Sequence, residues 1–123
     1  MNKNHYIVLG AIILLLSGFG LWYFTKPKMA YANIEQFAQC LRDKGAVMYG
    51  AYWCPHCQRE KAAFGEAFKF VSYVECTQDT QKCTDAGIKG YPTWIFPDGR
   101  RFEGELGLEG LSKESGCVLE AVK

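Results

Sequence analysis

The sequence has no excess of charge of either sign. It carries 14 basic and 13 acidic residues in 123, a formal net charge of +1, and they are scattered along the chain. A surface that binds nucleic acid needs a concentrated positive field to neutralise phosphates, and this chain does not have one. We therefore expect no nucleic acid partner.

The sequence also shows no internal repeat and no low-complexity segment, and it is too short for a second folded domain. When an apolar N-terminal segment is set aside, about 90 residues remain, which is enough for one small core. Hydrophobic residues make up 49% and aromatic residues 15% of the chain, so this part should fold rather than stay disordered. We predict one α/β domain over residues 33–123.

A long uncharged run begins the sequence. The 19 residues from Tyr6 to Phe24 carry no charge. As a helix rising about 1.5 Å per residue, they match the hydrocarbon core of a bilayer, which is about 30 Å thick. We predict one N-terminal transmembrane helix in an anchor segment over residues 1–28, attached to the membrane through residues 6–24, and a linker over residues 29–32.

A cleaved signal peptide is the alternative interpretation of this segment. Ala30-Tyr31-Ala32 has the small-x-small pattern that a signal peptidase reads, with cleavage after Ala32. The apolar run is longer than the usual signal-peptide core of about 7–15 residues, and Lys26 and Lys28 crowd the cleavage region. Retention of the anchor is therefore favoured.

Six cysteines are the strongest compositional feature. Cytosolic thiols are kept reduced, so this many cysteines in a short chain indicate disulfides or a metal.

Charge does not orient the anchor, because Lys3 precedes the run and Lys26 and Lys28 follow it. The cysteines decide instead, and we predict a single-pass membrane protein whose domain lies on the extracytoplasmic (periplasmic or lumenal) side.

Hydrophobic periodicity predicts alternating helices and strands. A helix should run from Ile34 to about Gly45, capped by Asn33 with Gln36 completing a capping box. The run over 46–52 predicts a strand that is covered on both faces. The remaining expected elements are a helix over 55–70, a strand over 71–75, a short helix over 80–86, strands over 93–96 and 101–103, and a helix over 108–114. This order predicts a central mixed sheet flanked by helices, with parallel pairing first and antiparallel pairing last.

Cys54-Pro55-His56-Cys57 lies at the predicted start of a helix. Two cysteines separated by two residues can close a small disulfide, and the unpaired amides and dipole of the helix start stabilise a thiolate on Cys54. Cys57 follows about one turn later, where it can attack a mixed disulfide and release the substrate. Both are predicted to be catalytic, with Cys54 attacking and Cys57 resolving.

The two residues between these cysteines tune the balance between dithiol and disulfide. Pro55 suits the first helical turn, and His56 adds a potential positive charge and a hydrogen-bond donor beside the thiolate. Stabilising the reduced form makes the disulfide a stronger oxidant, by about 30 mV per 1.4 kcal/mol. The sequence therefore favours oxidation of substrates over their reduction.

A structural zinc site is the other interpretation of the Cys-x-x-Cys pair. Its second half would need Cys76 and Cys83, but six residues separate them instead of about two to four. Haem attachment fails because Gln58, not histidine, follows Cys57. We predict no metal and no cofactor.

Trp53-Cys54-Pro55-His56-Cys57 between a strand and a helix, followed by Gly90-Tyr91-Pro92-Thr93 before a strand, resembles the thioredoxin superfamily over about residues 33–117. The tract MYGAYWCPHCQREK with the later GYPTW is similar to the thioredoxin-like domain fused to bacterial vitamin K epoxide reductase homologues, here without the four-helix quinone-reducing domain.

The resemblance implies a thioredoxin-like fold with a cis peptide bond before Pro92. The loop at Pro92 should face Cys54 and offer backbone groups to an extended substrate. Tyr91 is expected to line this substrate surface, and Trp53 either shields the disulfide or fills a groove. Trp53, Tyr91 and Pro92 are therefore the predicted substrate-binding residues.

The chain departs from the family pattern at one position. Thioredoxins and protein disulfide isomerases carry a buried acid six positions before the first cysteine, and it assists proton transfer at the resolving thiol. Here that position is Met48. The difference argues against fast turnover as a general reductase, and Glu60 or water would have to substitute.

The four other cysteines can pair in three ways. We favour the structural disulfides Cys76–Cys83, which closes a local loop, and Cys40–Cys117, which ties the first helix of the domain to the last. Their loop lengths predict contributions of about 2.5 and 4.5 kcal/mol respectively. The alternatives are that some are free buried thiols, as Cys40 could be, or that Cys76 and Cys83 relay electrons to a partner.

The predicted function is that of a membrane-tethered thiol-disulfide oxidoreductase. It would pass its disulfide to reduced or misoxidised secreted proteins and be reoxidised by a separate quinone-reducing membrane protein of the vitamin K epoxide reductase type. A second interpretation reverses the flow, with a membrane donor keeping an extracytoplasmic reductase or isomerase reduced. A third makes the chain a non-catalytic membrane-anchored binding module or chaperone with purely structural cysteines.

Overall fold

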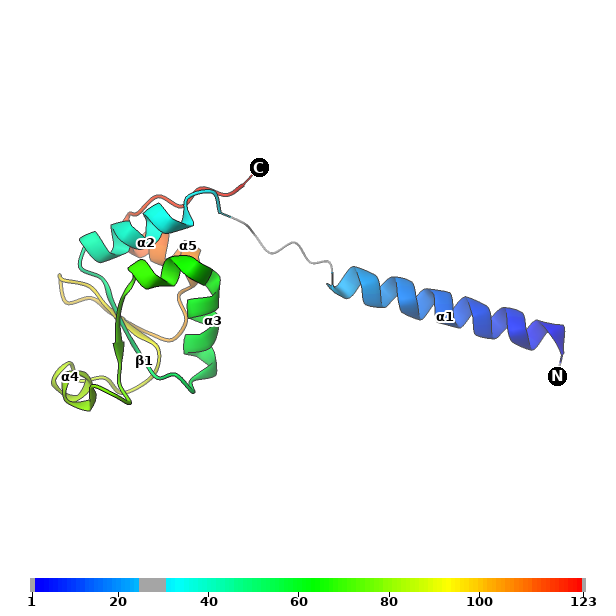
Figure 1. The fold of residues 1–123 in the computed structure, drawn as a ribbon, viewed down its shortest axis with the longest axis horizontal. Coiled ribbons are helices and arrows are strands. Elements are labelled where there is room, and N and C mark those ends of the chain that lie inside the picture. The colour runs from blue at the N-terminus through cyan, green and yellow to red at the C-terminus, as the bar shows by residue number, and fades with distance from the viewer. Residues whose placement is uncertain (1, 25–30, 123) are drawn as a thin grey trace. The chain divides into compact units, whose positions relative to one another are not determined.

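The computed structural model describes residues 2–24 and 31–122. The chain divides into two units, Met1–Ala30 and Tyr31–Lys123, and the second contains every cysteine (Figure 1).

The first unit is the helix α1 (Lys3–Phe24), which includes the uncharged run from Tyr6. Side chains on all sides of its first four turns are exposed, among them Ile7, Ile13 and Leu15. Within residues 2–24 and 31–122, no helix combines the length and the hydropathy needed to cross a bilayer. The flanking residues 25–28 and the linker residues 29–30 lie outside the described residues.

The second unit is built on a four-stranded sheet in the order β2-β1-β3-β4. The central strand β1 (Val47–Gly50) pairs in parallel with β2 (Ser72–Glu75) and antiparallel with β3 (Thr93–Ile95). β3 in turn pairs antiparallel with β4 (Arg101–Glu103). The predicted mixed sheet, with parallel pairing first and antiparallel pairing last, is confirmed.

The two faces of β1 differ in burial. Met48 and Gly50 are buried, whereas Val47 and Tyr49 on the other face remain partly exposed. The prediction of a strand covered on both faces is therefore only half right. One face receives the main helices, while the short helix α4 (Thr80–Asp85) contacts the neighbouring strand β2.

Three helices pack with one another and contribute to the core. They are α2 (Ile34–Asp43), α3 (Pro55–Phe64) and α5 (Gly107–Ser115), and α3 contacts both of the others. The core that they share with the sheet is centred on large side chains that are at most 3% exposed: Phe37, Leu41, Met48, Phe64, Trp94 and Leu111. Burying each such side chain contributes about 1.5–3 kcal/mol, so this cluster is the main source of the domain's stability.

The predicted helix over 55–70 is interrupted at Gly65. This glycine has φ +57° and ψ −133°, which is not a helical conformation and is readily reached only without a Cβ. The chain then continues as the 3₁₀ segment η1 (Gly65–Phe70) before β2 begins. The prediction of one continuous helix is wrong at this point.

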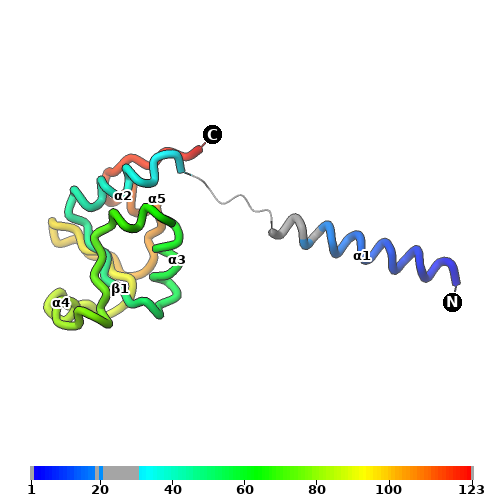
Figure 2. The backbone as a smooth tube through the Cα atoms, in the orientation of Figure 1, coloured from blue at the N-terminus to red at the C-terminus, as the bar shows by residue number. Residues whose placement is uncertain are grey.

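The two ends of the domain lie side by side, as the tube view shows (Figure 2). Ala32 donates its N–H to the carbonyl of Glu120 at 2.9 Å, and Tyr31 forms an antiparallel bridge with Ala121. Tyr31 and Ala32, which we placed in the linker, thus pair with the C-terminal tail. The side chain of Asn33 binds the same tail, donating to Val118 O at 3.0 Å and accepting from the N–H of Glu120 at 2.8 Å. It makes no cap hydrogen bond to α2, so the predicted capping box does not form.

Four of the cysteines form two disulfides. Cys40 of α2 is joined to Cys117, just beyond α5, with 6.0 Å between the Cα atoms. Cys76 at the end of β2 is joined to Cys83 of α4, with 5.7 Å between the Cα atoms. This is the pairing favoured from the sequence, and it leaves Cys54 and Cys57 as thiols.

Candidate active site

Cys54 lies at the junction of β1 and α3. Its backbone is extended, at φ −73° and ψ 118°, and it occupies the N-cap position with Pro55 as the first helical residue. The N–H of Cys57 donates to the sulfur of Cys54 at 3.3 Å. A backbone donor at the positive end of a helix favours a negative charge on this sulfur, as the sequence predicts.

Cys57 is one turn further into α3 and is fully buried. Burial, followed by its hydrogen bond with Cys54, raises the pKa of Cys57 to about 12. At neutral pH its sulfur is therefore held as a thiol. Cys54 and Cys57 thus play unequal parts: Cys54 accepts a backbone hydrogen bond at the helix start, and Cys57 is protected behind it.

Gly50 lets the sulfur of Cys57 approach the sheet. A Cβ at this position would lie 2.9 Å from the sulfur of Cys57 and 3.3 Å from the hydroxyl of Tyr73. Cys57 and Tyr73 therefore face the same point on β1 from two directions. Only glycine leaves room for both.

Gly50→Ala should disturb this arrangement. We expect a loss of about 1–3 kcal/mol in the free energy of unfolding, because the added methyl overlaps Cys57. Displacement of that sulfur should also slow closure of the Cys54–Cys57 disulfide, measured by thiol trapping after oxidation. Gly90→Ala is the matched control, since a Cβ there meets nothing within 4 Å. Equal effects of the two variants would contradict the close approach.

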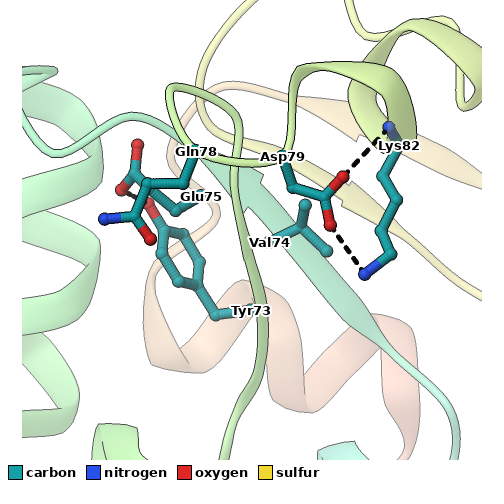
Figure 3. A pocket seen from close by; sticks show the side chains of 6 residues that line it. All are labelled: Tyr73, Val74, Glu75, Gln78, Asp79 and Lys82. Atoms are coloured by element: carbon teal, nitrogen blue, oxygen red, sulfur yellow. Dashed lines mark hydrogen bonds and ion pairs between the residues drawn. The ribbon is translucent and has the colours of Figure 1, made fainter.

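Tyr73 is held by a carboxylate on its own strand. Its hydroxyl donates to Glu75 at 2.6 Å, and Figure 3 shows the ring directed toward that side chain. Burial and the bond to Glu75 raise the pKa of Tyr73 above its ordinary value. Burial alone would raise the pKa of Glu75, but hydrogen bonds from Tyr73 and Thr77 outweigh it and lower that pKa.

A polar hollow of about 480 Å³ lies beside β2, lined by Tyr73, Val74, Glu75, Gln78, Asp79 and Lys82 (Figure 3). Its most prominent feature is the ion pair between Lys82 and Asp79, at 2.7 Å. Neither Cys54 nor Cys57 lines it. We therefore assign the hollow no part in the chemistry of the thiols.

The loop before β3 lies against Cys54. The peptide bond between Tyr91 and Pro92 is cis, and the Cys54 thiol lies 3.6 Å from the carbonyl oxygen of Tyr91. Pro92 is itself fully buried, and its carbonyl accepts from the N–H of Gly104 at 2.8 Å. Pro92 thus shapes the loop, while backbone groups beside it face the thiol.

Aromatic side chains form the exposed rim of this site. Trp53 is 57% exposed and meets Tyr91 edge to face, with 6.0 Å between the ring centroids. Tyr52 next to it is 67% exposed. The structure thus brings Trp53, Tyr91 and Pro92 together around Cys54, and Trp53 lies at the surface instead of filling a groove.

His56 is bound by a carboxylate that the sequence analysis missed. Its Nδ1 lies 2.6 Å from Glu105, which also receives Arg59 Nη2 at 2.7 Å. Arg59 first and His56 second lower the pKa of Glu105 to about 2, so the carboxylate is ionised. The positive charge expected beside Cys54 is therefore accompanied by a negative one. No spacing in the sequence links Glu105, in the loop after β4, to α3.

Glu60 lies on the buried face of α3 and is only 2% exposed. Its two oxygens accept from the indole N–H of Trp94 at 2.9 Å and from the N–H of Gly107 at 3.1 Å. These bonds tie α3 to β3 and to the start of α5. The sequence suggested Glu60 as a substitute for the acid that is absent at Met48. Its carboxylate instead accepts hydrogen bonds from Trp94 and Gly107, and neither of these bonds involves Cys57.

The pKa of Glu60 predicts a pH-dependent stability. Burial raises this pKa above the ordinary value of 4.5, although the hydrogen bonds from Gly107 and Trp94 act to lower it. A carboxyl group whose pKa is higher in the folded than in the unfolded state stabilises the fold at pH values below its unfolded-state pKa. This contribution is lost as the pH rises through its folded-state pKa. Compared with Glu60→Gln, the unchanged protein should therefore lose unfolding free energy from about pH 4.5 upward, measured by urea titration. The exposed Glu66→Gln is the control, and parallel pH profiles for wild type and Glu60→Gln would contradict this assignment.

A family comparison agrees with this geometry. The model of the thioredoxin family matches residues 28–114, which include the Cys-x-x-Cys pair and the cis-proline loop. The chain belongs to the thioredoxin family. The fold predicted from the sequence is therefore confirmed as thioredoxin-like.

Relatives of this thioredoxin domain bear names from thiol-disulfide chemistry. The chain is 44% identical over 92 residues to the thiol-disulfide oxidoreductase LTO1 of Arabidopsis thaliana, a match to 68% of the chain and 24% of the relative. It is 33% identical over 87 residues to the protein disulfide isomerase-like 2-2 of Oryza sativa subsp. japonica, covering 58% of the chain and 23% of the relative. The chain thus spans about a quarter of the length of these relatives.

Proposed function

We propose that this protein is a thiol-disulfide oxidoreductase whose redox pair is Cys54 and Cys57. The observation that carries the proposal is the pair of unbonded thiols at the start of α3, beside the cis-proline loop, in a domain whose four other cysteines are paired. The names of the relatives support the same chemistry.

The chemistry assigns a separate part to each sulfur. In the oxidised form, a substrate thiolate attacks the sulfur of Cys54, the Cys54–Cys57 bond breaks, and Cys57 leaves and takes up a proton. A second substrate thiolate then attacks the substrate sulfur of this mixed disulfide, and Cys54 leaves as the thiolate. The substrate loses two electrons and two protons and gains a disulfide, and the enzyme pair is left reduced. The raised pKa of Cys57 means that this sulfur ends the exchange as a thiol at neutral pH.

The substrates in this proposal are reduced or misoxidised proteins in extended conformation. The exposed ring of Trp53, the half-buried ring of Tyr91 and the backbone beside Pro92 border Cys54 and would hold such a chain. The disulfides Cys40–Cys117 and Cys76–Cys83 support an oxidising compartment, because such bonds seldom persist among cytosolic thiols. We therefore propose that the domain works on the extracytoplasmic side of a membrane.

Membrane attachment through residues 6–24 belongs to the same proposal. It rests on the sequence alone, on 19 consecutive residues without charge, since no helix in the described part of the chain meets the requirements for a span. Reoxidation by a quinone-reducing membrane protein of the vitamin K epoxide reductase type rests on the resemblance of MYGAYWCPHCQREK and GYPTW to the domain fused to such proteins.

Disulfide transfer tests the direction of this reaction. The full chain, purified in detergent and oxidised, is mixed with an unstructured peptide that carries two cysteines, with no other oxidant present. We expect one peptide disulfide to form for each oxidised chain, with Cys54 and Cys57 reduced in the same proportion. Failure to oxidise the peptide, with fast reduction of a peptide disulfide by the dithiol form, would overturn disulfide donation.

A reductase or isomerase is the second candidate. Glu105 favours it, because this carboxylate binds the His56 and Arg59 side chains that would otherwise stabilise the reduced form. The match to a relative named protein disulfide isomerase-like is consistent with it. A substrate protein with scrambled disulfides distinguishes the two candidates. An isomerase restores the native disulfide pairing of this substrate without a net change in its number of thiols.

A further inference from the structure

The loop after β4 connects the two halves of the candidate active site. The N–H of Gly104 binds the carbonyl of Pro92 at 2.8 Å, and the N–H of Gly107 binds Glu60 of α3 at 3.1 Å. Glu105 lies between these two attachments. Its backbone is thus fixed to the cis-proline loop on one side and to α3 on the other, which leaves its carboxylate directed at the first turns of α3.

The carboxylate of Glu105 binds two side chains of α3 that lie near Cys54. Arg59 makes a forked contact, with Nε 3.1 Å from both oxygens and Nη2 2.7 Å from Oε2. His56 Nδ1 lies 2.6 Å from Oε2. The carboxylate side chain is 30% exposed, against 60% for His56 and 57% for Arg59, so it is the most enclosed of the three.

These contacts determine which nitrogen of His56 carries a proton. Nδ1 also lies 2.7 Å from Arg59 Nη2, but arginine only donates hydrogen bonds. The ionised Glu105 only accepts, so a proton on Nδ1 satisfies the shorter contact to Glu105. Both Arg59 and His56 then donate to the same carboxylate.

Arg59 is within electrostatic reach of the attacking sulfur. The bond to Glu105 raises the pKa of Arg59, and negative charge on Cys54 raises it further. A cation in this position stabilises the Cys54 thiolate and with it the reduced form of the pair. The fixed negative charge of Glu105 opposes that effect, and its carboxylate binds both donors.

We propose that Glu105 is a positioning residue that lowers the reduction potential of the Cys54–Cys57 pair by holding His56 and Arg59. This inference rests on the proposed redox role of the two cysteines. The half-reaction adds two electrons to the Cys54–Cys57 bond and leaves Cys57 as a thiol that has gained a proton, and Cys54 as a thiolate or a thiol. Glu105 destabilises the thiolate form of Cys54, and therefore the reduced pair, so the disulfide is a weaker oxidant than its Cys-Pro-His-Cys sequence alone predicts.

Glu105→Gln tests this role in the full chain, equilibrated in detergent with reduced and oxidised glutathione and read by thiol trapping. The glutamine side chain has the same shape as the carboxylate without its charge. We expect the equilibrium constant to shift about tenfold toward the reduced enzyme, which corresponds to about 30 mV in potential. Glu103→Gln is the matched control, because it removes the same charge from an exposed residue of β4 and should leave the potential unchanged.

A second measurement separates positioning from a structural role. The shift in reduction potential caused by Glu105→Gln should largely disappear in a protein that also carries His56→Ala and Arg59→Ala, because the two side chains through which Glu105 acts are then absent. An undiminished shift there, or an unfolding midpoint that falls while the potential stays constant, would overturn the inference. Failure of this inference can be distinguished from failure of the proposed function. The proposed direction of transfer depends on the absolute reduction potential of the unchanged protein, whereas this inference depends on the difference in potential between the variants.

Discussion

Cys54→Ser should reduce disulfide exchange to the uncatalysed background. The attacking group in this chemistry is a thiolate, and a serine hydroxyl at the same place neither ionises near neutral pH nor forms a bond that a second thiol can exchange. The rate of disulfide formation in a two-cysteine peptide, followed by thiol trapping, measures the loss.

Cys57→Ser is the informative partner of this variant. It keeps the attacking sulfur but lacks the resolving one. When it is mixed with a peptide that carries a disulfide, Cys54 attacks that bond, one peptide sulfur leaves as a thiol, and the mixed disulfide should accumulate and be visible on a non-reducing gel. Both cysteines are buried, at 4% and 0% exposure, so unfolding curves must show that each variant is folded. Undiminished disulfide exchange by a folded Cys54→Ser protein would contradict the account.

Replacing Cys40 and Cys117 together by alanine should produce the largest loss of stability. The bond closes a loop over a sequence separation of 77 residues, and the restriction of the unfolded chain predicts a loss of about 4.5 kcal/mol. That is a large part of the roughly 5–15 kcal/mol of a small domain. Urea unfolding of the non-reduced protein measures it.

The second disulfide supplies the comparison. Cys76 and Cys83 are separated by only 7 positions, so their replacement by alanine should cost about 2.5 kcal/mol. A smaller loss for the Cys40–Cys117 pair than for the Cys76–Cys83 pair would contradict the assignment of the long bond as the main staple of the domain.

The features that were predictable from the sequence are those determined by local pattern. Cys54 and Cys57 follow an apolar strand and begin a helix at Pro55, and each of these signals lies within a few residues of the next. The relative direction of these paired strands follows from connection lengths, because the long connection between β1 and β2 contains a helix and allows parallel pairing, whereas the short one between β3 and β4 does not.

The features that were missed depend on contacts between distant segments. Glu105 reaches His56 across 49 positions, and Asn33 binds the tail across 87 instead of capping its own helix. A side chain with a local and a distant partner takes the one that the packed structure brings to it, and the sequence does not show which that is. Gly50 was missed for the same reason, since its neighbours Cys57 and Tyr73 come from a helix and from another strand.

The reduction potential of the Cys54–Cys57 pair tests the central claim most directly. The full chain in detergent is equilibrated against glutathione buffers, and the fraction of reduced pair is read by thiol trapping. Donation of disulfides predicts a value between about −120 and −180 mV, the range of dedicated oxidants and isomerases. A value near thioredoxin's, about −270 mV, would contradict donation and would make this protein a reductase.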